Sequence, residues 1–128
     1  MPNDKKILIV EDDRFFSSLL KSRLEKLGNI VFQAFDGQEG IEMARKENPD
    51  LIILDLIIPK LPGFEFLQQI SSDPALSRTP VVIASNLGQD TDIAKAKTLG
   101  VVDYYVKVQT PIDKFVDVLT NILSQPRA

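Results

Sequence analysis

The sequence contains no cysteine and no histidine among its 128 residues. Without cysteine the chain cannot form disulfides, thiolate nucleophiles or cysteine-ligated zinc sites. Without histidine it cannot use imidazole as a general acid or base, build a serine–histidine triad or ligate a metal through imidazole. Any metal that this chain binds must therefore be held by oxygen atoms, which favours Mg²⁺, Mn²⁺ or Ca²⁺.

Long apolar runs and regions of a single charge are also missing. No stretch approaches membrane-spanning length and residues 1–6 are polar, so we expect no membrane insertion and a cytoplasmic location. The net charge of −3 is spread along the chain without a basic stripe, so we expect no direct binding to nucleic acid. The length and the apolar fraction of 44% predict one domain over residues 1–128, with a core of about 5–124 and no output domain.

The strongest pattern is an apolar run that is interrupted by one aspartate. Residues 51–54 are all apolar, Asp55 follows, and residues 56–58 are apolar again before a segment rich in proline and glycine. The run predicts a strand buried on both faces in a parallel sheet, and the proline- and glycine-rich segment after it predicts a loop at the carboxyl end of that strand. Asp55 therefore lies where open α/β sheets bind ligands, although a solvated strand-end aspartate or a turn cap is an alternative.

Four other apolar segments predict strands, and apolar residues at helical spacing predict helices between them. The predicted strands span 7–10, 30–34, 81–84 and 101–106. Gly28 predicts a helix end, Asp36 and Glu39 predict a capping box, and Thr110 with Pro111 predicts the N-cap and first residue of the last helix. The alternation predicts an α/β fold with a five-stranded parallel sheet and helices on both faces; on this pattern alone, flavodoxin-like and Rossmann-like strand orders both stay open.

Polar side chains of complementary kinds follow four of these strands. Because the carboxyl ends of parallel strands share one edge, these side chains should converge; they are Glu11, Asp12, Asp13, Asp55, Ser85 and Lys107. Clustered carboxylates repel one another, and an oxygen-liganded cation such as Mg²⁺ relieves the repulsion. With an ammonium and a hydroxyl beside it, a carboxylate can serve as the nucleophile of a phosphoryl transfer. Taken singly, each residue could instead be a helix cap or a solvated charge.

As a set, these motifs resemble the receiver domain of bacterial two-component response regulators, and the chain is similar to the single-domain chemotaxis-type regulators. The matching segments are residues 7–12, Leu54–Asp55 with Pro59 and Gly63, Ala84–Ser85 and 105–107. The resemblance implies the flavodoxin-like strand order 2-1-3-4-5. It also implies that Asp55 accepts a phosphoryl group from a sensor histidine kinase or phosphotransfer protein, and that the domain signals to a downstream protein target rather than acting as an enzyme.

The resemblance also assigns a Mg²⁺ site. It implies that Glu11 and Asp12 hold the cation together with Asp55 and the backbone carbonyl of Ile57. The three consecutive acids leave Asp12 and Asp13 as an alternative pair, and we prefer Glu11 and Asp12 because they directly follow the apolar run.

Ser85 and Lys107 stand at the family's hydroxyl and lysine positions, and Tyr104 stands at its switch aromatic. The sequence departs from the family pattern at two neighbouring places. The lysine is normally followed by proline with a cis bond, and Val108 follows here; because a non-proline cis bond costs about 2.5–4 kcal/mol, we expect a trans peptide. The residue after the hydroxyl is usually small, and Asn86 follows here.

Two other functions share part of this pattern. The chain could be a pseudo-receiver that is not phosphorylated and acts only as an interaction module, but the complete set of acids, hydroxyl and lysine argues against this. A haloacid-dehalogenase-like phosphatase would need a second aspartate two residues after Asp55, where this sequence has Ile57.

Overall fold

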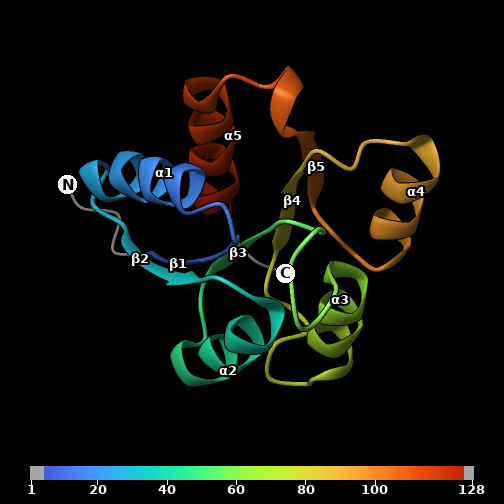
Figure 1. Cartoon of the computed structure of the whole chain (residues 1–128). Coiled ribbons are helices and arrows are strands. Elements are labelled where there is room, and N and C mark those ends of the chain that lie inside the picture. The colour runs from blue at the N-terminus through green and yellow to red at the C-terminus, as the bar shows by residue number, and fades with distance from the viewer. Residues whose placement is uncertain (1–4, 126–128) are drawn as a thin grey trace.

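The computed structural model describes residues 5–125, which form a parallel five-stranded sheet between two layers of helices (Figure 1). In chain order the elements are β1 (Lys6–Val10), α1 (Arg14–Lys26), β2 (Ile30–Ala34), α2 (Gly37–Glu47), β3 (Leu51–Leu54), α3 (Gly63–Ser72), β4 (Val81–Ser85), α4 (Asp90–Thr98), β5 (Asp103–Val106), the 3₁₀ helix η1 (Lys107–Gln109) and α5 (Ile112–Ser124). The strand order β2-β1-β3-β4-β5 confirms the predicted α/β class and flavodoxin-like order. The predicted domain limits at residues 1 and 128 lie outside the described residues.

The sheet separates two apolar cores. On one face, α1 and α5 pack against alternate residues of the inner strands, such as Ile7 and Ile53. On the other face, α2, α3 and α4 cover the residues in between, such as Leu8 and Ile52 (Figure 1). Because β3 is covered on both sides, all four of its residues are buried, as its uninterrupted apolar run predicted. Within residues 5–125, no helix combines the length and apolar character that crossing a bilayer requires.

Local sequence signals account for where the helices begin and end. The carboxylate of Asp36 accepts a hydrogen bond from the Glu39 backbone N–H at 2.7 Å, as the predicted capping box requires. The Glu39 side chain accepts from the Phe35 backbone N–H at 3.0 Å, one residue before the N-cap. Gly28 follows the C-cap of α1 with a φ of 91°, a conformation that glycine adopts without steric cost.

Two predicted boundaries near the C-terminus were wrong. β5 begins at Asp103 rather than Val101, because the Val101 backbone N–H still bonds to Ala96 O in the last turn of α4. Thr110 is not the N-cap of the last helix. Its backbone N–H bonds back to Lys107 O and closes the 3₁₀ turn, so the N-cap moves to Pro111 and α5 begins one residue later.

The loop after β3 is packed tightly against its surroundings. A Cβ atom on Gly63 would lie 2.4 Å from Leu56 Cα, and the Gly63 backbone N–H donates to Leu56 O at 3.1 Å. The same loop is tied to α2, since the Gly37 backbone N–H donates to Pro59 O at 3.1 Å. Only glycine permits this close approach, which fixes the path of the chain as it leaves Asp55.

Candidate functional site

The strand register brings the predicted site residues to one edge of the sheet. Val10 pairs with Leu54, so Glu11 and Asp55 each come directly after paired residues on neighbouring strands. Ser85 pairs with Val106 on the other side, next to Lys107. Side chains separated by up to 96 positions in the sequence therefore meet at the carboxyl edge, where open α/β sheets bind ligands.

Asp55 lies at the centre of this edge and is 6% exposed. Its backbone N–H donates to Val10 O at 3.0 Å, which extends the β1–β3 ladder by one residue. Its Oδ1 accepts from the Ile57 backbone N–H at 2.9 Å, and its Oδ2 accepts from Lys107 Nζ at 2.8 Å. The carboxylate is thus buried with a charge-assisted partner, and each oxygen keeps a further lone pair for a ligand.

Glu11 is buried beside Asp55, with 2% of its surface exposed. Its Oε2 accepts from the Asp13 backbone N–H at 3.0 Å, and its Oε1 forms an ion pair with the Lys107 ammonium. Burial is the main cause that raises the pKa of Glu11 to about 7, the charge of Asp55 raises it further, and the contact with Lys107 opposes both. The site therefore holds two neighbouring buried carboxyl groups and one ammonium.

Lys107 reaches this edge from the first residue of η1, and its side chain is 13% exposed. Burial alone would lower the pKa of its ammonium, but the hydrogen bonds to Asp55 and Glu11 outweigh burial, so the pKa lies above its usual value. The ammonium also lies over the ring of Phe16, 4.6 Å from the ring centroid. Lys107 is therefore a cation at neutral pH, with contacts to the residues that directly follow β1 and β3 and to α1.

The three consecutive acids after β1 occupy different environments. Glu11, Asp12 and Asp55 offer carboxylate oxygens that all lie within 4.8 Å of one another, a spacing that fits a shared cation. Asp13 instead caps α1, since its Oδ1 accepts from the Phe16 backbone N–H at 3.1 Å. This arrangement favours Glu11 and Asp12 over Asp12 and Asp13 as the pair for a metal.

Ser85 and Tyr104 meet through the backbone of Leu87. The fully buried Ser85 hydroxyl accepts from the Leu87 backbone N–H at 3.2 Å, and the Tyr104 hydroxyl donates to the Leu87 carbonyl. Burial, followed by the charges of Asp92 and Asp55, raises the pKa of Tyr104 to about 12. The structure therefore places Ser85 at the predicted edge, but its hydroxyl is bonded to the loop after β4 rather than to Asp55.

Val108 and Asn86, the two departures from the family pattern, are hydrogen-bonded to each other. The Val108 backbone N–H donates to Asn86 Oδ1 at 3.1 Å. Residues 5–125 contain no cis peptide bond, so the peptide between Lys107 and Val108 is trans, as expected. Val108 itself is 78% exposed at the rim of the site.

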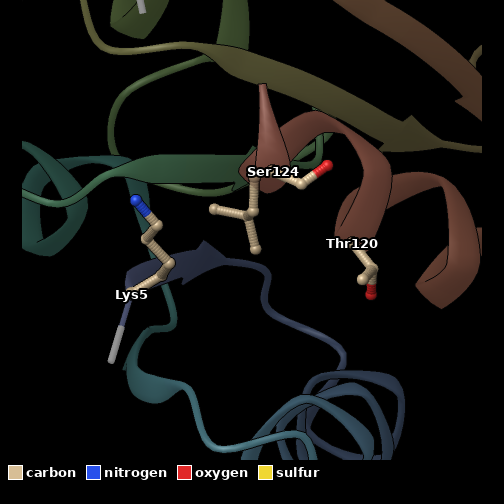
Figure 2. Close-up of a pocket in the computed structure, with 4 residues that line it drawn as sticks. Lys5, Thr120 and Ser124 are labelled. Atoms are coloured by element: carbon tan, nitrogen blue, oxygen red, sulfur yellow. The ribbon is translucent and has the colours of Figure 1, made fainter. Parts of the chain in front are cut away.

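A separate small cavity lies at the opposite edge of the sheet. It has a volume of about 100 Å³ and lies between Lys5, just before β1, and Thr120, Leu123 and Ser124 of α5. Figure 2 shows that the Lys5 amino group and the Ser124 hydroxyl point away from each other. Because its polar groups do not converge, we assign no ligand to this cavity.

Taken together, the fold and the site define a flavodoxin-like α/β domain with an acidic, lysine-bearing site at the carboxyl edge of its sheet. The chain belongs to the response regulator receiver domain family, whose sequence profile matches residues 7–119. It is 37% identical over 109 residues to protein PilH of Pseudomonas aeruginosa, and the match covers 85% of this chain and 88% of PilH. The chain spans less than half the length of several transcriptional regulators that it also matches.

Solved structures agree with this assignment. The BeF₃-activated receiver domain of RstA from Klebsiella pneumoniae superimposes with a TM-score of 0.84 at 28% identity, covering 94% of this chain and 99% of that one. The Mn²⁺-bound form of the response regulator Rcp1 superimposes with a TM-score of 0.85 at 28% identity, covering 97% of this chain and 99% of that one. The predicted resemblance to receiver domains, and with it membership of a signalling family, is therefore confirmed.

The sequence did not predict two contacts in the site: that of the Phe16 ring with Lys107, and those of the Leu87 backbone with Ser85 and Tyr104. The spacing of Phe16 in α1 predicted only a buried helical face, and Leu87 lies in a loop without a motif. A sequence pattern carries no signal for the direction of a ring or a carbonyl group toward a residue on another strand.

Proposed function

We propose that this chain is a phosphoacceptor in two-component signalling. Asp55 takes a phosphoryl group from a histidine kinase or phosphotransfer protein, and the modified domain changes its binding to a downstream protein. One observation carries the proposal: the Asp55 carboxylate is buried, lies 2.8 Å from Lys107 Nζ and is flanked by Glu11 and Asp12. The Mn²⁺-bound and BeF₃-activated neighbours are consistent with a domain that binds metals and phosphoryl mimics.

In the transfer, a carboxylate oxygen of Asp55 attacks the phosphorus of the donor's phosphohistidine. The new O–P bond forms as the N–P bond breaks, and the electron pair of that bond stays on the donor's imidazole, which then takes up a proton. Lys107 lies beside the attacking carboxylate and balances the negative charge of the phosphoryl oxygens. Because the site is largely buried, this interaction is stronger than it would be in water.

The donor set of the site fits a hard divalent cation. Glu11, Asp12 and Asp55 supply carboxylate oxygens, and the backbone carbonyl of Ile57 completes the proposed ligands of Mg²⁺. When bound, Mg²⁺ neutralises the clustered carboxylates and the phosphoryl oxygens. Binding should weaken as the pH falls, because the carboxylates must be ionised to hold the cation.

Two aspartate variants test the metal assignment by calorimetry with Mg²⁺. Asp12→Ala is expected to weaken binding strongly. Asp13→Ala is expected to bind Mg²⁺ with nearly wild-type affinity but to lose about 1 kcal/mol of stability, because Asp13 caps α1. Equal affinity in Asp12→Ala and the wild type would contradict the assignment, and loss of binding in Asp13→Ala alone would favour the other pair.

The output would pass through Ser85 and Tyr104. In its present contact the Ser85 hydroxyl accepts from the Leu87 backbone N–H, and a phosphoryl group on Asp55 would offer a strong acceptor for the hydroxyl proton, drawing Ser85 and the loop after it toward Asp55. Because the Tyr104 hydroxyl is bonded to the same residue, a shift of that loop would release the ring and allow it to turn inward. NMR spectra of free and beryllofluoride-bound protein should therefore differ at Tyr104 and on the face formed by α4, β5 and α5; unchanged spectra there would rule out this route.

Phosphorylation itself is tested by mass spectrometry after incubation with acetyl phosphate and Mg²⁺. One phosphate is expected, and peptide mapping should place it on Asp55. Asp55→Asn serves as the control, since its amide cannot form the acyl phosphate. Full labelling of that variant, or labelling elsewhere in the wild type, would overturn the proposal, and an unmodified wild type would favour a pseudo-receiver that acts only through binding.

A further inference from the structure

The ring of Phe16 contacts the Lys107 ammonium from the side of α1. The distance of 4.6 Å from Nζ to the ring centroid lies within the range of about 6 Å over which a cation is attracted to an aromatic face. Phe16 is half-buried and packs against the core beneath α1 and α5, so its ring is held in place. Lys107 therefore has three partners, of which two are carboxylates and one is an uncharged ring.

The neighbours of Phe16 do not share this contact. Arg14, the nearest cationic residue in the sequence, stacks over Phe35 with its guanidinium carbon 3.9 Å from that ring's centroid. Phe15 is 78% exposed, and its ring contacts no cationic side chain within residues 5–125. Of the two adjacent phenylalanines, only Phe16 contacts the Lys107 ammonium, so Phe15 provides a matched control.

The ring differs from the two carboxylates in how it responds to a divalent cation. Glu11 and Asp55 belong to the proposed Mg²⁺ ligands, so the cation and the Lys107 ammonium share the same two carboxylate groups. Mg²⁺ prefers oxygen ligands and does not compete for an aromatic face. Lysine has a flexible four-carbon stem, so an ammonium that shares its carboxylate partners needs another anchor to keep one position.

We propose that Phe16 is a positioning residue, whose ring keeps the Lys107 ammonium beside Asp55 while Mg²⁺ engages the carboxylates. The ammonium is then in place when the phosphoryl oxygens arrive. This role rests on the proposed phosphoacceptor function, but the contact between ring and ammonium can be measured without any phosphorylation.

The first experiment measures the contact by NMR of the Lys107 ε-methylene group, assigned by its loss in Lys107→Met. A group held over a ring face is shifted upfield, so an upfield signal is expected in the wild type and in Phe15→Leu, both with and without Mg²⁺. Phe16→Leu should return the signal to the ordinary lysine position. A wild-type signal that is not shifted, or that loses its shift when Mg²⁺ is added, would overturn the inference.

The second experiment measures the rate of Asp55 phosphorylation by acetyl phosphate at saturating Mg²⁺, with fluorinated phenylalanines placed at position 16. Stepwise fluorination weakens the negative ring face with little change in ring size, so a packing role alone would leave the rate unchanged. We expect a graded decrease that reaches about threefold to tenfold for the trifluorinated ring, near wild-type rates for Phe16→Tyr and Phe15→Leu, and a similar loss for Phe16→Leu.

The outcomes separate the two proposals. Equal rates across the fluorinated series, with phosphate on Asp55 throughout, would overturn the positioning role and leave the phosphoacceptor function intact. A wild-type protein that carries no phosphate on Asp55 would overturn the proposed function and the positioning role with it.

Discussion

The Glu11 carboxyl should make the stability of the metal-free protein fall as the pH rises. Burial raises the pKa of Glu11 from 4.5 to about 7, so the unfolded chain releases this proton at a lower pH than the folded one. Between these two values the folded state binds more protons, and stability declines through this window. The interval corresponds to about 3 kcal/mol of stability, which is fully present below pH 4.5 and lost above pH 7.

Glu11→Gln removes the titrating group and should remove this slope. Urea unfolding in the presence of EDTA at pH 5 and pH 8 measures it, and the wild type is expected to lose about 2–3 kcal/mol more than the variant over this range. Glu42→Gln, at an exposed position on α2, is the matched control and should behave as the wild type. Excess Mg²⁺ should reduce the difference, because a bound cation stabilises the ionised site. Parallel curves for the wild type and Glu11→Gln would refute the reasoning.

Three further variants test the scaffold and the phosphorylated state. Asp36→Ala removes the N-cap acceptor of α2 and should lower the free energy of unfolding by about 1 kcal/mol in urea titrations; no change would mean that the cap is dispensable. Gly63→Ala would place a Cβ atom 2.4 Å from Leu56 Cα, so a loss of about 1–3 kcal/mol is expected, and an unchanged midpoint would show that the loop relaxes freely. Ile57 and Leu87 lie two residues after Asp55 and Ser85, and we expect their side chains to flank the water that attacks the phosphoryl group. Because apolar side chains cannot orient that water, the double variant Ile57→Asn, Leu87→Glu should lose its aspartyl phosphate faster than the wild type at equal Mg²⁺; an equal or slower loss would contradict this.

The sequence predicted the architecture because the fold depends mainly on patterns that are local in the chain. Each strand is a short apolar run, and β3 is apolar on both faces because helices cover both sides of the sheet centre. Asp55 and Lys107 could be placed because each directly follows such a run and parallel strands end at one edge. The periodicity left the strand order open, and the resemblance to a family supplied the order that the structure confirms.

The contacts between site residues could not be predicted in the same way. Whether Ser85 bonds to Asp55 or to Leu87 depends on the path of the loop after β4, and no pattern encodes that path. The error at Thr110 has a similar origin. Thr110 before a proline is a good cap signal, but here Thr110 ends the 3₁₀ turn that starts at Lys107, and α5 begins after Pro111 without a side-chain cap.

The two departures from the receiver pattern explain each other. A proline after Lys107 would have no backbone N–H, whereas Val108 has one and donates it to Asn86 Oδ1. A glycine or alanine at position 86 would have no side-chain oxygen to accept that hydrogen bond. The bond joins the loop after Ser85 to the turn that carries Lys107, so it links the hydroxyl and the ammonium of the site through their own loops. Because the hydrogen bond needs both the Val108 backbone N–H and the Asn86 side-chain oxygen, the two departures are coupled in this structure.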